Sequence, residues 1–456
     1  MPRSNFYILL SAVLVYILTS GVTLRDRLLV STLHRIERNA YFEPAAKDLF
    51  EGAMAGMTDE LPDGYSQYIP PIRETFYRDR LDNRYEGFGI TVRFHKTEGE
   101  NKFFIDYPQH DSPAYRIGLR SGDQILQVDG TPLADKTYGE ALRLLKQQTE
   151  SGRRLTIVPF GQTEPKDFSV QHERIHSDSV VGDYYDADRR VFHLESHPKI
   201  GYIQITSFSG TTPQEFDDAL EDMMQSGVES FILDLRENSG GDVWSCIQIA
   251  RMLMAPDPVA GNVIVTVWDR EGTQRLRHRH FVLTEGSQRC ALPMVVLING
   301  ESASAAEILA AALQDHRRAT IVGTRSFGKG IIQSIIELPF RSGILQLTDS
   351  EYRRPNGAPV HQKRDSSDSD DWGVIPDKIV ELSEAESTVM AYRTLRSNAI
   401  STRRQAVLDQ FRQQVKKQDD KFEFTGTAPY YDPQIDEAVK ILEDCGSANG
   451  SVGGCP

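Results

Sequence analysis

The sequence has little of the positive charge and cysteine spacing that nucleic-acid and zinc binding require. Its 456 residues include four cysteines, none of them in the C-x-x-C spacing of zinc ligands, and H-E-x-x-H occurs once, at residues 172–176. Lysine and arginine number 51 against 65 aspartates and glutamates, which gives a formal charge of −14. Because binding of nucleic-acid phosphates requires concentrated positive charge, we expect no nucleic-acid partner. We also expect no metal and no cofactor.

A second absence concerns the histidine base of a serine hydrolase. The G-x-S-x-G elbow of the α/β-hydrolases does not occur in the chain. Asp315 and His316 follow Ser304 by 11 and 12 residues on what is predicted to be one helix. At about 1.5 Å per residue they would lie roughly 16 to 18 Å from Ser304, which is too far for proton transfer.

Lys329 is the base that remains for Ser304, which precedes it by 25 residues. Ser304 lies where an alanine-rich helical stretch begins, so its hydroxyl would be exposed and the amides that follow would be free to donate. Lys329 lies between Gly328 and Gly330, which lets other backbone approach closely. An amine becomes a base when its pKa falls from about 10.4 to about 7, at roughly 4 to 5 kcal/mol, so we expect apolar groups around Lys329. Ser302 is the local rival as nucleophile.

The same glycines suggest a phosphate loop, which the neighbouring residues argue against. Gly323, Gly328 and Lys329 match the G-x-x-x-x-G-K spacing. That motif continues with a serine or threonine that binds magnesium and then with a helix, whereas Gly330 comes next here and the β-branched run 331–336 predicts a strand. We therefore do not expect nucleotide binding.

The stretch Glu301–Gln333 resembles the active-site region of the carboxy-terminal processing peptidases, also called tail-specific proteases. In this serine–lysine family the nucleophile is the second serine of S-A-S-[AS]-[AS]-E, here Ser304. The base is the lysine of F-G-K-G, here Lys329, and a glutamine four residues further on, here Gln333, orients the lysine. The resemblance covers about residues 30 to 380.

A second element of the resemblance is the turn D-L-R-x-N-x-G-G, which spans residues 234–241. In the family a backbone amide of this turn, with the amide after the nucleophile, forms the oxyanion hole. The resemblance thus implies Gly240 or Gly241 together with Ala305. Ser239 stands where proline is commoner. Family assignments also include an aspartate at the position of Asp315. Because the predicted helix would place Asp315 too far from Ser304, we expect a structural role for it.

Residues 84–163 are similar to a PDZ domain. The G-F-G-I segment formed by Gly87, Phe88, Gly89 and Ile90 would be the carboxylate-binding loop, in which the amides of the last three residues face a chain terminus. Such a groove takes a peptide as an added β-strand and holds its free carboxylate. The alternative is a plain hairpin with glycine turns. We expect a helix over 137–148 to flank the groove.

Apolar runs predict the fold class of the rest. Strands are expected at 199–205, 231–235 and 293–298, alternating with helices at 213–225 and 243–254, which is typical of an α/β core. We expect a mixed α/β multidomain protein, a tail-specific protease core with an inserted PDZ domain and flanking helices. The predicted parts are a membrane segment 1–25, a helical region 26–83, the PDZ domain 84–163, the protease core 164–384 and a C-terminal helical region 385–456.

The N-terminus predicts the location of the protein. Residues 6–24 form 19 positions without a charge, close to the length that spans a bilayer. No clear A-x-A cleavage site follows, so we expect an uncleaved anchor, with a removed signal peptide as the alternative. The resemblance implies a bacterial periplasmic enzyme held to the inner membrane.

The cysteines are compatible with an oxidising compartment. Cys445 and Cys455 flank a glycine- and serine-rich segment and could close a small disulfide loop. Cys246 and Cys290 lie in apolar or structured stretches, where free thiols and a bridge are both open.

The combined function hypothesis is a serine endopeptidase that cleaves proteins near their C-termini, with the PDZ domain capturing the terminus. Its partners would be proteins or peptides with free C-termini, and the resemblance leaves room for an adaptor protein and a homo-oligomer. The alternatives are a catalytically silent PDZ scaffold that only binds partners and a membrane-associated hydrolase of small esters.

Overall fold

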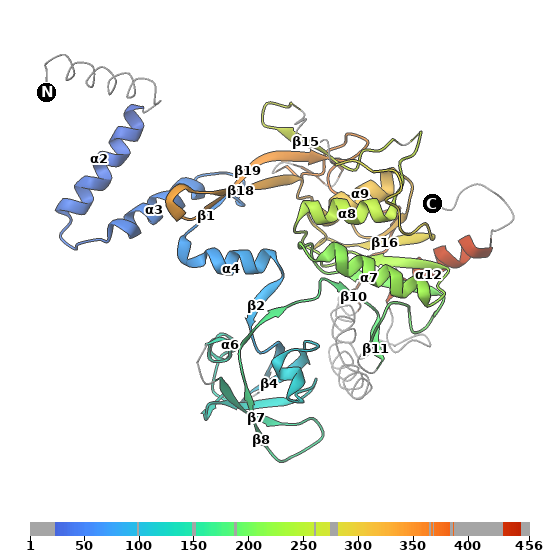
Figure 1. The fold of residues 1–456 in the computed structure, drawn as a ribbon, viewed down its shortest axis with the longest axis horizontal. Coiled ribbons are helices and arrows are strands. Elements are labelled where there is room, and N and C mark those ends of the chain that lie inside the picture. Colours follow the sequence, from blue (N-terminus) through green and yellow to red (C-terminus); the bar gives the residue numbers. More distant parts are fainter. Residues whose placement is uncertain are drawn as a thin grey trace. The chain divides into compact units, whose positions relative to one another are not determined.

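The computed structural model describes most of the chain between residues 23 and 447 (Figure 1). The chain divides into two compact units, Met1–Thr75 with Gln333–Thr348, and Phe76–Ile332 with Asp349–Pro456. The described residues are 23–97, 100–147, 152–186, 189–259, 261–273, 281–363, 366–367, 369–383, 386 and 432–447.

The larger unit contains a six-stranded sheet in the order β10-β13-β14-β16-β17-β20. The strands from β13 to β20 are parallel, and β10 is antiparallel to β13. Central strands such as β16 are apolar and buried at every position, as expected for a parallel sheet covered on both faces. The bounds are β10 Val180–Val181, β13 Ile200–Ile205, β14 Ser230–Asp234, β16 Met294–Ile298, β17 Thr320–Gly323 and β20 Lys378–Ile379.

Helices cover both faces of this sheet. One face packs against α7 Thr212–Gln225, α8 Val243–Leu253 and α9 Ala305–Asp315 (Figure 1). The other packs against α12 Pro433–Ser447, whose apolar side chains share a core with Tyr202 of β13. This arrangement confirms the predicted mixed α/β class.

The larger unit also contains a smaller domain, formed by residues 84–176, which has a hydrophobic core of its own. The strand order in its sheet is β3-β4-β5-β7-β8, and β6 pairs with β5. The flanking strands β2 and β9 pair with each other antiparallel. The bounds are β2 Arg84–Gly87, β3 Ile90–Thr97, β4 Glu100–Pro108, α5 Pro113–Arg116, β5 Gln124–Val128, β6 Thr131–Pro132, α6 Tyr138–Lys146, β7 Arg153–Val158, β8 Lys166–Val170 and β9 Glu173–His176.

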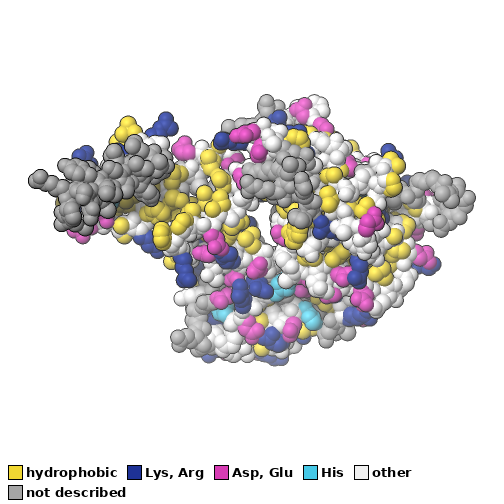
Figure 2. Space-filling model, turned by 45° about the horizontal axis from the view of Figure 1, so that its top comes forward, with side chains coloured by type: hydrophobic (Ala, Val, Ile, Leu, Met, Phe, Trp, Pro, Cys, Tyr) yellow, Lys and Arg dark blue, Asp and Glu magenta, His cyan; other side chains and the backbone are white. Residues whose placement is uncertain are grey.

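The smaller unit begins with helices α2 Leu24–Asn39 and α3 Ala46–Asp59 and continues with strand β1 Gln67–Ile69. Helices α2 and α3 lie largely within the helical region predicted over 26–83. No residue of α2 is buried, and its exposed apolar side chains add to the hydrophobic surface visible in Figure 2. Among the described helices none is both long and apolar enough to cross a bilayer. The predicted membrane segment 6–24 lies almost wholly outside the described residues.

Two long strands, β18 Ile331–Glu337 and β19 Ile344–Arg353, pair with each other, and each has residues in both units. The remaining elements are short. Their bounds are α4 Pro71–Leu81, β11 Tyr184–Asp186, β12 Arg189–Val191, β15 Thr266–Asp269 and the 3-10 turn η2 Pro339–Arg341. Strand β18 confirms the strand predicted after Lys329 in place of a phosphate-loop helix.

The cysteines divide as the sequence allowed. Cys246 and Cys290 are free and buried. Cys445, near the end of α12, takes part in a disulfide. Its expected partner, Cys455, lies outside the described residues.

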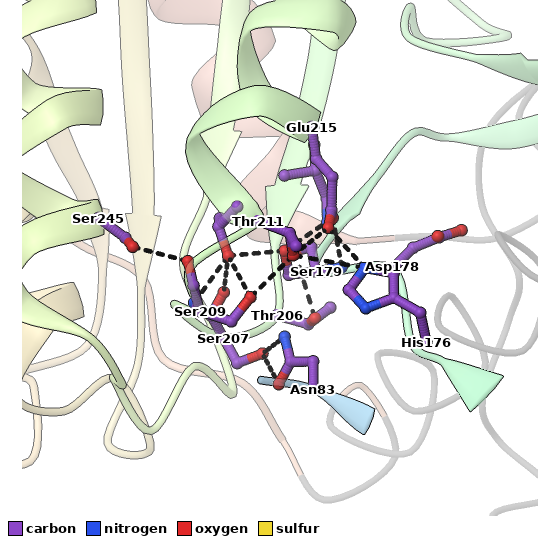
Figure 3. A network of polar contacts seen from close by, with 12 residues as sticks. Asn83, His176, Asp178, Ser179, Thr206, Ser207, Ser209, Thr211, Glu215 and Ser245 are labelled. Atoms are coloured by element: carbon purple, nitrogen blue, oxygen red, sulfur yellow. Dashed lines mark hydrogen bonds and ion pairs between the residues drawn. The ribbon is translucent and has the colours of Figure 1, made fainter. Parts of the chain in front are cut away.

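A polar network joins the strands that flank the smaller domain to the start of α7 (Figure 3). Asn83, next to β2, donates from Nδ2 to Ser207 Oγ at 2.8 Å. His176, the last residue of β9, contacts Glu215 Oε1 at 2.8 Å, and the amide of Ser179 donates to the other oxygen of Glu215 at 2.7 Å. Both connections to the small domain are thus tied to one region of the core.

A buried ion cluster anchors α12 beneath the sheet. Arg236, 1% exposed, donates to the carboxylates of Asp234 and Asp432 at distances from 2.6 to 3.1 Å. Gln434 Oε1 accepts a further bond at 2.9 Å, and the hydroxyl of Tyr202 donates to Asp234 at 2.7 Å. Buried charges need such complete pairing, because removing one partner leaves another uncompensated in a medium of low dielectric.

We predict that Arg236→Met lowers the free energy of unfolding by about 3 to 5 kcal/mol, since two buried carboxylates lose their counter-ion. Lys199→Met is the control, because Lys199 and its partner Glu229 are 74% and 67% exposed; it should cost no more than about 1 kcal/mol. Urea denaturation followed by circular dichroism measures both. Equal losses for the two variants would contradict the role given to the cluster.

Candidate active site

Two turns meet at one edge of the parallel sheet. The turn 235–242 follows β14, and the turn 299–304 follows the neighbouring strand β16. Because adjacent parallel strands end at the same edge, the segments that follow them lie side by side, and this edge is where open α/β sheets bind ligands. The amide of Ala303 donates to the carbonyl of Asn238 at 2.9 Å, which joins the two turns directly.

Ser304 lies in the second turn, immediately before α9, with φ 56° and ψ −115°. This is a strained conformation for a residue with a side chain, and strain of this kind gathers at functional sites. The strand, sharp turn and helix reproduce the geometry of a nucleophile elbow without its G-x-S-x-G sequence. The residue is only partly buried. Its backbone strain left no signal in the sequence.

Ser302 occupies a different environment. Its side chain is fully buried, and its hydroxyl donates to the carbonyl of Leu235 at 2.8 Å. The same hydroxyl accepts a hydrogen bond from the amide of Asn299 at 2.9 Å. Ser302 therefore braces the turn, and the geometry favours Ser304 as the reactive hydroxyl.

Lys329 lies in a tightly packed turn between β17 and β18. A side chain at Gly330 would place Cβ 2.3 Å from the amide nitrogen of His361, and one at Gly328 would come within 2.8 Å of Trp372. These glycines thus let the turn sit against its neighbours, as predicted. Burial lowers the pKa of Lys329, while the carboxylate of Glu307 works in the opposite direction. The sequence predicted apolar groups around this amine, but a carboxylate also acts on it.

Glu307, the third residue of α9, links the serine turn to the lysine turn. Its side chain is fully buried, and its Oε2 accepts hydrogen bonds from the amides of Ser304 and Lys329, each at 2.8 Å. The two amide nitrogens are therefore at most twice that distance, 5.6 Å, apart. Oε1 accepts from Ser326 Oγ and from the amide of Gly328, both at 2.6 Å. The backbones of the predicted nucleophile and base thus lie together.

Gly240 packs directly against the serine turn. A Cβ at this position would lie 2.7 Å from Ser304 Cβ and 3.0 Å from the amide nitrogen of Ala305. The amide of Gly240 donates to Asn238 Oδ1 at 2.8 Å, so it is engaged within the turn. The adjoining ladder with Phe208 uses the carbonyl of Gly240 and the amide of Asp242. The amides of Gly240 and Gly241 are the two oxyanion donors predicted in this turn. The amide of Gly241 takes part in neither the bond to Asn238 nor the two bonds with Phe208.

Gln333 belongs to the smaller unit, on strand β18. Its side-chain amide donates to Thr348 Oγ1 at 3.1 Å, and Thr348 Oγ1 donates to Asp63 at 3.0 Å. Asp63 also accepts from the amide and hydroxyl of Ser66. These contacts hold Gln333 in a polar network, and its predicted role towards Lys329 stays a prediction.

Asp315, at the far end of α9, is bound elsewhere. It forms an ion pair with Arg354 at 2.5 Å, with both side chains 9% exposed, and accepts from the side chain of Asn356 at 3.1 Å. The neighbouring ring of His316 contacts the carbonyl of Val263 at 2.7 Å. Neither residue joins the serine turn, in line with the helix-length argument.

The predicted carboxylate loop lies between β2 and β3. Gly87, Phe88 and Gly89 are buried, and the ring of Phe88 stacks on His172 with centroids 4.1 Å apart. The carbonyls of Phe88 and Gly89 accept from the amides of Ala114 and Gln109. Because this pairing fixes the loop through its carbonyls, the amides of Phe88, Gly89 and Ile90 stay the predicted ligands of a peptide terminus.

The chain is similar to known proteases. The model of peptidase family S41 matches residues 199–380, and a PDZ-domain model matches 104–159. A carboxy-terminal-processing protease of Bartonella bacilliformis is 30% identical over 403 residues, which cover 88% of this chain and 84% of that protein. A carboxyl-terminal-processing protease of Synechocystis sp. is 33% identical over 303 residues, 66% of this chain and 65% of that protein. A crystal structure of a putative S41 protease from Bacteroides fragilis aligns over 86% of this chain and 97% of its own, with 17% identity and a TM-score of 0.48.

We predict that Gly240→Ala slows labelling of Ser304 by a fluorophosphonate about 100-fold, because the added Cβ overlaps the serine turn and a displacement of about 1 Å is enough for such a loss. Gly357→Ala is the matched control, since Gly357 also has positive φ, +86° against +99°, but no atom lies within 4 Å of its added Cβ. Active-site mass spectrometry gives the labelling rates. Rapid labelling of the Gly240 variant at the rate of the control would refute the close packing.

Proposed function

Because the chain belongs to peptidase family S41, we propose that it is a serine endopeptidase that cleaves proteins near their C-termini, with Ser304 as nucleophile and Lys329 as general base. The observation that carries this proposal is the sharing of one carboxylate oxygen by the backbone amides of Ser304 and Lys329. It supports the pairing of a partly buried serine in an elbow conformation with a lysine whose pKa is lowered by burial.

The proposed reaction proceeds through an acyl-enzyme. Ser304 Oγ attacks the carbonyl carbon of the scissile peptide bond while its proton passes to neutral Lys329 Nζ. The tetrahedral intermediate collapses as the C–N bond breaks, and the departing amine takes the proton from Lys329. Water then gives a proton to Lys329 and attacks the ester carbonyl. As the C–O bond to Ser304 breaks, Lys329 returns that proton to Ser304 Oγ, and the new C-terminus is released.

Backbone amides would stabilise the negative charge of the tetrahedral intermediate. The amide of Ala305 begins α9, where the first amides of a helix point outwards without partners within the helix. A second amide would come from Gly240 or Gly241, and the bond from Gly240 to Asn238 favours Gly241. Each donor that is already in place is typically worth about 3 to 4 kcal/mol in the transition state.

We assign capture of the substrate terminus to the PDZ domain. Its loop at Gly87, Phe88, Gly89 and Ile90 would bind the carboxylate, and the rest of the peptide would pair as a strand. The network of Figure 3 supports a connection to catalysis, because Ser207 lies beside Phe208, whose backbone pairs with the turn that carries Gly241. Peptide binding at one end could therefore change the population of the competent turn.

The cellular setting proposed is the periplasm, with the protein held to the bacterial inner membrane by residues 6–24. The membrane segment is proposed from the uncharged run, and the periplasmic location from the family resemblance. Protein substrates with free C-termini would be the partners, and an adaptor protein and a homo-oligomer are open additions.

We predict that Ser304→Ala and Lys329→Ala each lower the rate of peptide cleavage by at least about 10³-fold while leaving the circular dichroism spectrum unchanged, because the two residues act as one unit. Ser302→Ala is the matched control in the same turn; it should mainly lower stability, by about 1 to 3 kcal/mol, since it removes a buried hydrogen bond. Liquid chromatography of a cleaved reporter peptide measures the rates. Cleavage that survives in the Lys329 variant would refute the assignment.

We further predict that amidation of the substrate's C-terminus lowers kcat/KM for cleavage, because the amide nest of the PDZ loop loses its anionic ligand. The comparison uses one peptide in free and amidated form, and a small ester as a substrate without a terminus. A catalytically silent scaffold would bind the free peptide without cleaving it. An ester hydrolase would instead treat both peptides alike and turn over the ester.

A further inference from the structure

Two buried side chains outside the serine and lysine each contact the backbones of both. The first is Glu307, whose Oε2 receives the amides of Ser304 and Lys329. All four groups that bond to its carboxylate are donors, two on each oxygen. An ionised carboxylate accepts about four hydrogen bonds and donates none, so this environment matches the charged form. The pKa of Glu307 is raised overall, because burial outweighs the hydrogen bonds from Ser326, Gly328 and the two amides, which favour the charged form.

The second side chain is Tyr352, on strand β19. Its hydroxyl lies within hydrogen-bond distance of the carbonyls of Ser304, at 2.9 Å, and of Lys329, so its single proton is shared between these two acceptors. The side chain is 1% exposed, and its own amide donates to the carbonyl of Gly330 at 2.9 Å. Burial raises the pKa of the phenol well above its ordinary value, and the negative charge of Glu307 adds to this. The hydroxyl therefore keeps the proton that it donates.

The two side chains act on complementary groups of the same two residues. Glu307 can only accept, and it binds the amides of Ser304 and Lys329; Tyr352 donates, and it binds their carbonyls. Ser304 has a strained backbone, which persists only where the surroundings fix it. Fixation from both sides meets that requirement. If either side chain were shortened, the backbone groups that it binds would be left without a hydrogen bond in a buried site.

We propose that Glu307 and Tyr352 are positioning residues of the catalytic pair, which set the distance between the hydroxyl of Ser304 and the amine of Lys329 by holding the two backbones together. This inference rests on the proposed function. Neither residue exchanges a proton with the substrate. Both act through the peptide groups of the residues that do.

The charge of Glu307 gives this role a measurable signature. The carboxylate raises the pKa of Lys329, against the lowering by burial. Lys329 must be neutral to act, so kcat/KM rises with pH through the pKa of Lys329. Removing the charge lowers that pKa and moves the acidic limb of the pH profile to lower pH. A residue that only stabilised the fold would change the yield of active enzyme without moving this limb.

The first test is Tyr352→Phe, which removes one hydroxyl and keeps the buried ring. We expect kcat to fall about 100-fold with KM nearly unchanged, since a small misplacement of the pair slows the chemical step. Tyr68→Phe is the matched control, because Tyr68 is also buried and its hydroxyl also donates to a backbone carbonyl, that of Ser342 at 2.6 Å. The control should keep its kcat. A Tyr352 variant with the same kcat as the control would overturn the inference.

The second test is Glu307→Gln, which keeps the shape and removes the charge. We expect a lower kcat together with an acidic limb of kcat/KM that lies at lower pH than in the parent enzyme. A limb that stays in place, or a kcat equal to that of the parent, would overturn the role of Glu307. Should this variant fail to fold, Tyr352→Phe decides the inference alone.

The proposed function and this inference fail in different ways. If the parent enzyme does not cleave, or if Ser304→Ala still cleaves, the proposed function is wrong and the inference falls with it. If the parent cleaves and both Ser304→Ala and Lys329→Ala are inactive, the proposed function stands. Parental kcat in Tyr352→Phe and Glu307→Gln would then reject the positioning role alone.

Discussion

The active-site geometry depends on the close approach of two turns at one edge of a parallel sheet. The register of β14 with β16, in which Asp234 pairs with Leu297, fixes where both turns begin. The approach is possible because position 240 has no side chain, since a Cβ there would lie within 3.0 Å of three atoms of the serine turn. The consequence is an elbow at Ser304, from which α9 begins at the same edge of the sheet.

Charge is buried on both sides of this edge, with different results. Beneath it, Arg236 neutralises part of two carboxylates and fastens α12 to the sheet. Above it, the carboxylate of Glu307 accepts hydrogen bonds from three backbone amides and the hydroxyl of Ser326. The nearby amine of Lys329 is therefore subject to two opposing effects, burial that favours the neutral form and a negative charge that favours the ammonium.

The sequence was enough to predict what depends on local pattern. Strands expected at 199–205, 231–235 and 293–298 correspond to β13, β14 and β16, because long apolar runs between turns have few other solutions. The strand after Lys329 followed from its β-branched residues. The pairing of α12 with the core was not predictable, since Arg236 and Asp432 are 196 residues apart in the chain.

The same limit applied to the candidate site. Ser304 and Lys329 could be recognised in the sequence as the candidate nucleophile and base. The strained backbone of Ser304 could not be predicted, because it depends on tertiary packing. The contact of Tyr352 with Ser304 joins positions 48 residues apart, and no local pattern encodes it. Glu307 did leave a signal, because it is the one charged residue among the otherwise apolar positions 305–313 of α9, where a charge is buried only if it is fully bound.

The central claim is that Lys329 carries a neutral amine at the pH at which the protein works. Nuclear magnetic resonance titration of protein labelled with ¹³C at the lysine ε-carbons tests it directly, with Lys329→Ala used to assign the signal. We expect the pKa of Lys329 to lie clearly below those of the exposed lysines of the same chain. A titration of Lys329 in the same range as the exposed lysines, with substrate peptide bound, would contradict the account.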